Sequence, residues 1–351
     1  MRWPRSARKH GDAAVNLDLR DLAPATVAAD GVGACVPALA RGRVHSVFRR
    51  ACNIQTCAGE LLTLLASDLG NQPHGIRLAA PGASLSERLR PGQDTFLEGG
   101  RLCVPAAGFT ADFSRAAIWN GTLDAASTML CDAGDPNKIS QALREMRAIL
   151  CEHAPAQGIA ILLKGFAGSL PALERALAAH LMRRLPALAH ATRARESGAV
   201  VAAAAGLVGL GTGLTPSGDD FIVGYLAALR CRAGREAGIG ALLRNAAVPL
   251  DRVIVHTHAI SRQMLGDALD GRFAEHLIDV VCAIQGVGDI VTATWQALQS
   301  GHSSGADTLC GLLFGHSPEL LLAPAQSLRR PARAGSGQYG REAGMAAMLT
   351  C

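Results

Sequence analysis

GLGTGLTPSGDDFIVGYLAAL, residues 209–229, is a glycine-rich loop that leads directly into an apolar segment. Residues 221–229 are apolar on nearly every face, which predicts a helix buried on all sides. Loop glycines let backbone N–H groups approach a ligand, and the first turn of a helix offers unpaired N–H donors at the positive end of its dipole. This combination predicts an anion site at the helix start. The loop is neither a Walker loop nor a dinucleotide fingerprint, because no Gly-Lys-Ser/Thr follows and its spacing is GxGxG.

A second stretch, GHSSGADTLCGLL at residues 301–313, repeats the pattern of the first. Residues 217–226 and 304–313 share S-G-x-D-x-[IL]-x-G-x-L, six matched positions that lie 87 residues apart. We therefore predict that two helix N-termini face one anionic ligand. The structural alternative is that each motif is a variant capping box, followed by a glycine that permits close helix packing.

Three features favour a functional site over two good helix starts. The glycine loop before Thr215 is longer than a cap requires, and His302 and Ser303 can donate protons or bind an anion. A glycine inside a helix also costs about 1 kcal/mol relative to alanine, in a chain that uses alanine freely elsewhere. The paired Asp219 and Asp220 could hold Mg²⁺ against a phosphate, orient a substrate amide, or simply favour the helix start.

The segment between the two motifs carries further polar candidates. Thr257 and Ser261 are four residues apart, which predicts that they share a helix face, although either hydroxyl could simply bond to a helix carbonyl. Arg262 could clamp a carboxylate, or it could be a solvated charge. His256 and His258 are two residues apart and are poor candidates for a shared metal site, because a helix would need them four apart.

The rest of the chain divides into a β-rich and an α-rich half. Short β-like runs, separated by Pro-Gly and Gly-Gly turns, fill residues 31–120. Long alanine- and leucine-rich stretches follow residue 132, with helix starts expected at Asp135, Pro171 and Pro186. Further helices are expected over residues 251–270, 273–284 and 290–300, with Gly271 and Gly301 as C-terminal caps, and residues 198–218 suggest a buried helix that runs into the glycine loop.

We therefore predict an α+β protein in which a small β-barrel or sandwich-like domain precedes a mostly helical domain. The expected boundaries are a basic extension over residues 1–30, a β domain over 31–120, an α domain over 135–322 and a disordered tail over 323–351.

Composition excludes several classes of protein. The 351 residues carry a net charge of +5, with 18% charged and 49% hydrophobic residues, which is too apolar for wholesale disorder. The modest positive charge is concentrated at the two ends and aromatic residues are only 4%, so a nucleic-acid interface is not expected. Ten cysteines without a CxxC pair argue against a disulfide scaffold. Residues 198–218 are not expected to span a membrane, because of Pro216 and the glycines at 206, 209, 211, 213 and 218. No secretory signal is evident, so a cytoplasmic protein is expected.

The two glycine–aspartate motifs, together with the segment that carries Thr257 and Ser261, resemble the signature of the AllH-like family. The resemblance covers about residues 31–322. It implies a subunit of an oxamate carbamoyltransferase, in which oxalurate and phosphate give oxamate and carbamoyl phosphate during anaerobic allantoin breakdown. It also implies two partners, one resembling acyl-CoA synthetases and one a further transferase subunit. The alternatives are a non-catalytic assembly subunit and a paralogue that acts on another small carbamoyl or acyl anion.

The resemblance places site residues in the two motifs but implies no individual catalytic roles, and our reading of the residue patterns adds candidates in the glycine loop and between the motifs. Catalytic roles are expected for Asp219, Asp220, His302 and Asp307; substrate or anion binding is expected for Gly211, Gly213, Thr215, Ser217, Gly218, Thr257, Ser261, Arg262, Ser303, Ser304 and Gly305. As a mechanism, we hypothesise that N–H groups of Gly211, Gly213 and Gly218 cradle phosphate or the oxalurate carboxylate. An Asp would orient the carbamoyl NH₂, and His302 would shuttle a proton. No cofactor other than the Mg²⁺ considered above is expected.

Overall fold

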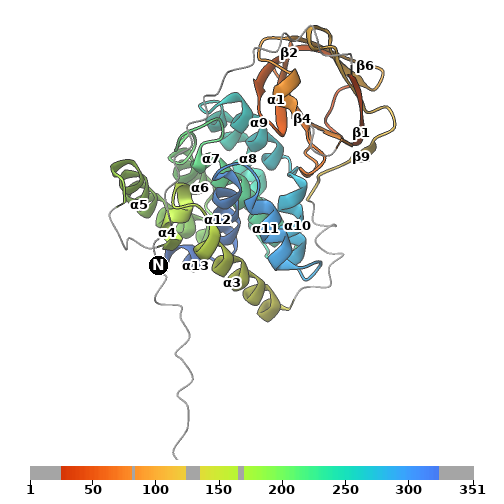
Figure 1. The fold of residues 1–351 in the computed structure, drawn as a ribbon. Coiled ribbons are helices and arrows are strands. Elements are labelled where there is room, and N and C mark those ends of the chain that lie inside the picture. The colour runs from red at the N-terminus through yellow and green to blue at the C-terminus, as the bar shows by residue number, and fades with distance from the viewer. Residues whose placement is uncertain (1–24, 81–83, 124–134, 165–169, 324–351) are drawn as a thin grey trace, which may run out of the picture.

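The computed structural model describes residues 25–80, 84–123, 135–164 and 170–323. It has two parts, as expected for the α+β class: a β-barrel, coloured red to yellow-brown in Figure 1, and a helical domain, coloured green to blue. The basic N-terminal residues 1–24 and the expected tail lie outside the described residues, apart from residue 323. The barrel begins at Ala25, inside the segment that we expected to be an extension.

The barrel is a sheet closed on itself. Its strands pair in the order β5-β4-β3-β2-β6-β7-β8-β1, and β1 returns to β5 in antiparallel register, with Val32 opposite Ile76. A further strand, β9, pairs in parallel with the end of β1. The strands are β1 Ala25–Gly33, β2 Leu39–Val47, β3 Ala51–Thr56, β4 Leu61–Leu65, β5 Gly75–Leu78, β6 Asp94–Glu98, β7 Arg101–Val104, β8 Phe109–Asp112 and β9 Ala117–Trp119.

Alternating sequence produces the barrel core. In β6, for example, Thr95 and Leu97 are buried while their neighbours are exposed, as period-2 geometry requires. The inward side chains form one hydrophobic cluster that includes Val44, Ile54 and Leu102. The short elements α1 Leu85–Arg88 and η2 Pro105–Ala107 connect strands. Closure leaves no sheet edge within the eight-strand ring, which removes a common route to aggregation.

The helical domain is built around two helices that are buried over almost their whole length. Every residue from Ser217 to Leu229 in α7 is buried, and so is every residue from Gly305 to Gly315 in α12. The helices are α3 Pro136–His153, α4 Ile161–Lys164, α5 Ala172–Ala194, α6 Ser197–Ala205, α7 Ser217–Ala233, α8 Ile239–Ile254, α9 Ala259–Leu269, α10 Glu275–Ile284, α11 Ile290–Leu298, α12 Ser304–His316 and α13 Pro318–Leu322, with the short helix η3 Gly158–Ala160 between α3 and α4. The predicted buried helix is therefore confirmed. Among the described residues, no helix is both long and apolar enough to cross a membrane.

Several predicted helix starts and caps are confirmed. The Asp135 carboxylate accepts a hydrogen bond from the Asn137 N–H at 2.9 Å and caps α3. Pro171 is the N-cap of α5. Gly271 and Gly301 have positive φ angles after α9 and α11, the conformation that glycine supplies at helix ends.

Two predicted helix boundaries and one predicted burial are wrong. Pro186 opens no helix but lies inside α5, on its exposed face, because the leucine stripe at Leu181, Leu185 and Leu188 packs continuously past it. Residues 251–270 are not one helix but the end of α8 and all of α9, separated where Thr257 leaves the helical path. Residues 197–205 form the expected helix, but it is only half-buried.

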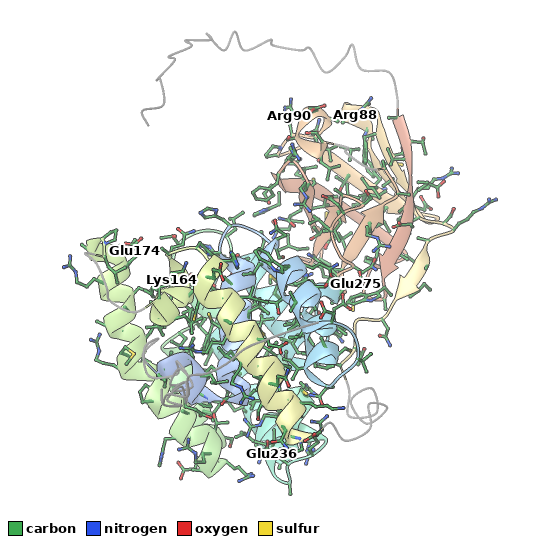
Figure 2. All side chains as sticks on the ribbon, turned by 60° about the horizontal axis from the view of Figure 1, so that its bottom comes forward. Arg88, Arg90, Lys164, Glu174, Glu236 and Glu275 are labelled. Carbon is green, nitrogen blue, oxygen red and sulfur yellow. The ribbon has the colours of Figure 1, made fainter. Side chains whose placement is uncertain are left out.

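The barrel and the helical domain are joined by hydrogen bonds from several elements. Glu275, at the start of α10, accepts from the backbone N–H and the side-chain amide of Asn71 at 2.7 and 2.9 Å, and Figure 2 shows it between the two parts. Gln263 of α9 both accepts from and donates to the backbone of Leu61 in β4, at 2.7 and 2.6 Å. These bonds fix the barrel against α9 and α10.

Candidate functional site

The two S-G-x-D motifs begin α7 and α12, and these helices cross each other in close contact. A Cβ added to Gly224 would lie 1.8 Å from the Thr308 carbonyl oxygen, and one added to Gly311 would lie 1.9 Å from that of Phe221. Phe221 and Thr308 occupy matching positions of the repeat, so the contact is reciprocal. The repeated glycine therefore has a structural role, as the packing alternative predicted.

The capping-box alternative, by contrast, is wrong. Pro216 is the N-cap of α7 and Ser303 that of α12, and neither helix has a side-chain cap hydrogen bond. Each serine instead faces the other helix: the Ser304 hydroxyl lies close enough to the Asp220 carboxyl, and the Ser217 hydroxyl to that of Asp307, to lower the pKa of that carboxyl. Each motif thus completes the polar contacts of the other. This crossed pairing explains why Ser and Asp repeat at the same spacing.

Asp220 is a buried carboxyl group, and no cationic side chain among the described residues acts on its pKa. It is 1% exposed, and burial raises its pKa well above the usual value. The hydroxyls of Ser304 and Thr215 act in the opposite direction, while the charges of Asp307 and Asp219 raise the pKa further. Its Oδ2 has no hydrogen-bond partner within the described part of the chain. This raised pKa favours the protonated form of Asp220, in which the carboxyl group can donate a hydrogen bond.

Asp307 has a similar environment with a different set of donors. It is fully buried, and this burial raises its pKa to about 7. The Ile159 N–H donates to its Oδ1 at 2.6 Å, and the Ser217 and Ser303 hydroxyls also lower the pKa. The approach is possible because residue 158 is glycine: a Cβ there would lie 2.3 Å from Oδ1. A carboxyl group with a pKa near 7 can gain or lose a proton at physiological pH.

Asp219 is held by the glycine loop and by the segment before α9. Its Oδ1 accepts from the Gly209 N–H at 2.7 Å, and its Oδ2 accepts from the Thr257 hydroxyl. Ser261, the first buried residue of α9, has its hydroxyl 3.5 Å from the Leu214 carbonyl oxygen. Thr257 precedes α9, so the expected shared helix face is wrong, yet both hydroxyls do reach the glycine loop or the helix that follows it.

The glycine loop itself is exposed from Gly211 to Leu214. Gly211 and Gly213 have φ angles of +121° and +95°, which favour glycine. The N–H groups of these two residues make no hydrogen bond within the described ranges, whereas the Gly218 N–H donates to the Leu210 carbonyl at 2.8 Å. Of the three N–H groups expected to cradle an anion, Gly218 is already engaged.

Two predicted site residues lie apart from this buried cluster. His302 is exposed in the turn before α12. Arg262 is exposed on α9, where it lines a cleft of about 630 Å³ between the helical domain and the barrel. The remaining candidates lie around the crossing of α7 and α12: Thr215, Ser217, Gly218, Asp219, Asp220, Thr257, Ser303, Ser304, Gly305 and Asp307.

Comparison with known families identifies the chain. The model of oxamate carbamoyltransferase subunit AllH matches residues 207–316, which span both motifs and the crossing. The model of the AllH family N-terminal domain matches residues 25–118, which form the barrel. Together the two matches cover more than half of the chain. The chain belongs to the AllH family. No solved structure matches the chain.

The family is described as a subunit of oxamate carbamoyltransferase, which indicates that the chain is a subunit of a carbamoyltransferase complex. The residues matched by the AllH model contain the crossed Ser–Asp pairs, Thr257 and the glycine loop. Gly158 and Ile159 lie outside that match and were missed by the sequence reasoning, because nothing in the local sequence indicates that their backbone contacts Asp307.

Proposed function

We propose that this AllH chain takes part directly in the conversion of oxalurate and phosphate to oxamate and carbamoyl phosphate, with the α7–α12 crossing as the reactive centre. The observation that carries the proposal is the pair of buried carboxyls, Asp220 and Asp307, each with one oxygen lacking a hydrogen-bond partner within the described residues. Burying two uncompensated acids is costly, and such groups concentrate at functional sites.

The reaction needs one proton to move. A phosphate oxygen attacks the carbamoyl carbon, the bond from that carbon to the oxamate nitrogen breaks, and the electron pair goes to the nitrogen. The proton lost by phosphate must reach the same nitrogen. Asp307, with a pKa of about 7, has the acidity to accept and return it. Protonated Asp220 would hydrogen-bond the carbamoyl oxygen or the substrate carboxylate.

The glycine loop would supply the anion contacts. Gly211 and Gly213 are exposed residues of the loop that precedes α7, and their N–H groups would bind phosphate or the oxalurate carboxylate. Opening of this loop would admit the substrate, because Asp220 and Asp307 are closed off from solvent. Mg²⁺ at Asp219 and Asp220 stays a prediction, as does a proton-transfer role for His302.

The family name calls the chain a subunit, so the assay requires the complex. We propose a cytoplasmic assembly with a subunit resembling acyl-CoA synthetases and a further transferase subunit, acting in allantoin breakdown.

The complex would be reconstituted with Asp220→Asn or Asp307→Asn, and carbamoyl phosphate would be measured through ATP formation by a carbamate kinase. Both variants should lose activity at least about 100-fold, the range of general acid–base catalysis. Asp94→Asn, an exposed barrel control, should retain it.

A purely assembling subunit is the second candidate. It is favoured by the fact that Gly224 and Gly311 are fully explained by helix packing. This candidate predicts normal activity for Asp220→Asn and Asp307→Asn complexes of normal composition. It also predicts that the isolated chain binds neither oxalurate nor oxamate in isothermal titration calorimetry.

A further inference from the structure

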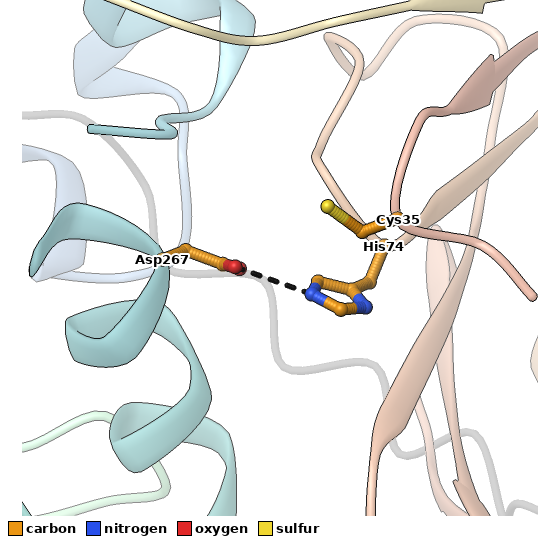
Figure 3. Close-up of side chains that lie close together, drawn as sticks. All are labelled: Cys35, His74 and Asp267. Carbon is orange, nitrogen blue, oxygen red and sulfur yellow. Dashed lines mark hydrogen bonds and ion pairs between the residues drawn. The ribbon is translucent and has the colours of Figure 1, made fainter. Parts of the chain in front are cut away.

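Three potential metal ligands from distant parts of the chain meet at the junction of the two domains. Cys35 follows β1, His74 precedes β5, and Asp267 lies in α9. One ligand atom from each residue lies within 4.8 Å of the other two. Figure 3 shows the Cys35 thiol and the Asp267 carboxylate both approaching the imidazole, and the bond from His74 Nε2 to Asp267 Oδ1 is 3.2 Å long.

The chemistry of the three side chains favours a zinc-class ion. A thiolate, an imidazole and a carboxylate are ligands that Zn²⁺ combines, whereas Mg²⁺ and Ca²⁺ prefer oxygen atoms. Three protein ligands leave one tetrahedral position open, as in catalytic zinc sites. A cysteine nucleophile with a histidine base would need a hydrogen bond between Cys35 and His74. Within the described residues none joins them, and His74 Nδ1 is buried without a partner.

The surroundings carry more negative than positive charge. Asp267 Oδ1 lies 3.3 Å from Nε of Arg272, and this contact leaves the second carboxylate oxygen of Asp267 available to an ion. Arg272 also forms an ion pair with Asp270. The adjoining cleft of about 630 Å³ is lined by four carboxylates and two guanidinium groups: Glu60, Asp251, Asp267, Asp270, Arg262 and Arg272. This balance attracts a divalent cation.

We propose that Cys35, His74 and Asp267 form a Zn²⁺ site that ties the barrel to α9 and keeps one coordination position open to the cleft. His74 and Asp267 themselves line this cleft. The open position would accept water or the carbonyl oxygen of a small amide or carbamoyl compound, which are oxygen ligands that zinc polarises. The site is separate from the α7–α12 crossing, so zinc binding stands or falls independently of the reaction proposed above.

The test measures metal content rather than activity. The full chain, without a polyhistidine tag, is stripped of metal, incubated with Zn²⁺, separated by gel filtration and analysed by mass spectrometry for zinc. We expect about one zinc per chain, and a loss of zinc affinity of more than roughly tenfold in Cys35→Ser, His74→Ala and Asp267→Asn. The exposed Cys57 and His45 provide the matched controls Cys57→Ser and His45→Ala, which should bind zinc like the unmodified chain.

Cobalt substitution checks the ligand set in the folded protein. Co²⁺ bound at this site should show a thiolate charge-transfer band that disappears in Cys35→Ser but persists in Cys57→Ser, while circular dichroism stays unchanged. Substoichiometric zinc in the unmodified chain, equal zinc affinity in the three ligand variants, or a cobalt spectrum without the thiolate band would each overturn the proposal.

Discussion

The starts of α7 and α12 have the same sequence pattern but different surroundings. Both helices use a glycine for the crossing and a serine whose hydroxyl lowers the pKa of the aspartate of the other helix. Only α7 is preceded by the long exposed glycine loop and carries an additional aspartate, Asp219, held by Gly209 and Thr257. Asp307 of α12, which matches Asp220, accepts a hydrogen bond from the backbone N–H of Ile159. The shared glycines build the crossing and the shared aspartates form the reactive centre that we propose, whereas the differences between the two starts mark the anion contacts that we propose for the glycine loop.

The largest effects should come from the shared glycines. Gly224→Ala and Gly311→Ala would each drive a Cβ into a carbonyl oxygen of the other helix, and the two helices would have to separate. We expect each to lower the free energy of unfolding in urea by about 3 kcal/mol or more. A much larger loss in one variant than in the other would show that the crossing is not reciprocal.

Gly266→Ala is the matched control, because Gly266 lies inside α9 with no atom near the added Cβ. It should be neutral or should stabilise the protein by up to about 1 kcal/mol, the difference in helix propensity.

A second effect concerns the pH dependence of stability. The pKa of Asp307 is raised to about 7 in the folded state, from 3.8, so the folded protein retains a proton that the unfolded chain has lost. The free energy of unfolding should therefore fall as the pH rises from about 4 to 7, by up to about 1.4 kcal/mol per pH unit for this proton. Urea titrations of Asp307→Asn should show a shallower fall. An identical slope would contradict the raised pKa.

A smaller effect should come from the hydrogen bond between Thr257 and Asp219, which has no counterpart at the start of α12. Thr257→Ala removes one of the two donors to buried Asp219 and should lower the free energy of unfolding by about 1–2 kcal/mol. Thr257→Ser retains the hydroxyl and should stay within about 0.5 kcal/mol of the unmodified chain. Equal losses in the two variants would assign the effect to the methyl group rather than to the hydrogen bond.

The smallest change in stability should come from two glycines with positive φ angles, and only one of them should also affect phosphate binding. Gly213→Ala and Gly301→Ala each place alanine at a positive φ, +95° and +67°, and each should cost about 1 kcal/mol. Only Gly213→Ala should weaken phosphate binding in calorimetry. Gly213 lies in the glycine loop that we propose as the anion site, whereas Gly301 lies outside this loop. Equal phosphate affinity in both variants would remove the loop from the anion site.

The repeated motif predicted much of the buried centre. Because S-G-x-D recurs with a glycine at the same helical position, the meeting of α7 and α12 followed from sequence, as did the candidate aspartates. The crossed pairing of each serine with the aspartate of the other helix did not, since a local pattern suggests local caps. Cys35, His74 and Asp267 could not be found at all, because residues that far apart share no periodicity and are brought together by the docking of the barrel on α9. The break between α8 and α9 within residues 251–270 was missed, because the helical pattern of these residues does not indicate that Thr257 bonds Asp219.

The central claim is that the buried carboxyls of Asp220 and Asp307 contact the substrate. Difference infrared spectroscopy of the complex, with ¹³C-labelled aspartate in this chain alone, measures it most directly. Oxamate plus phosphate should shift the C=O stretch of a protonated aspartate, and the Asp220→Asn, Asp307→Asn double variant should show no such shift. A protonated aspartate band that does not respond to the ligands, or a shift that survives in the double variant, would contradict the account.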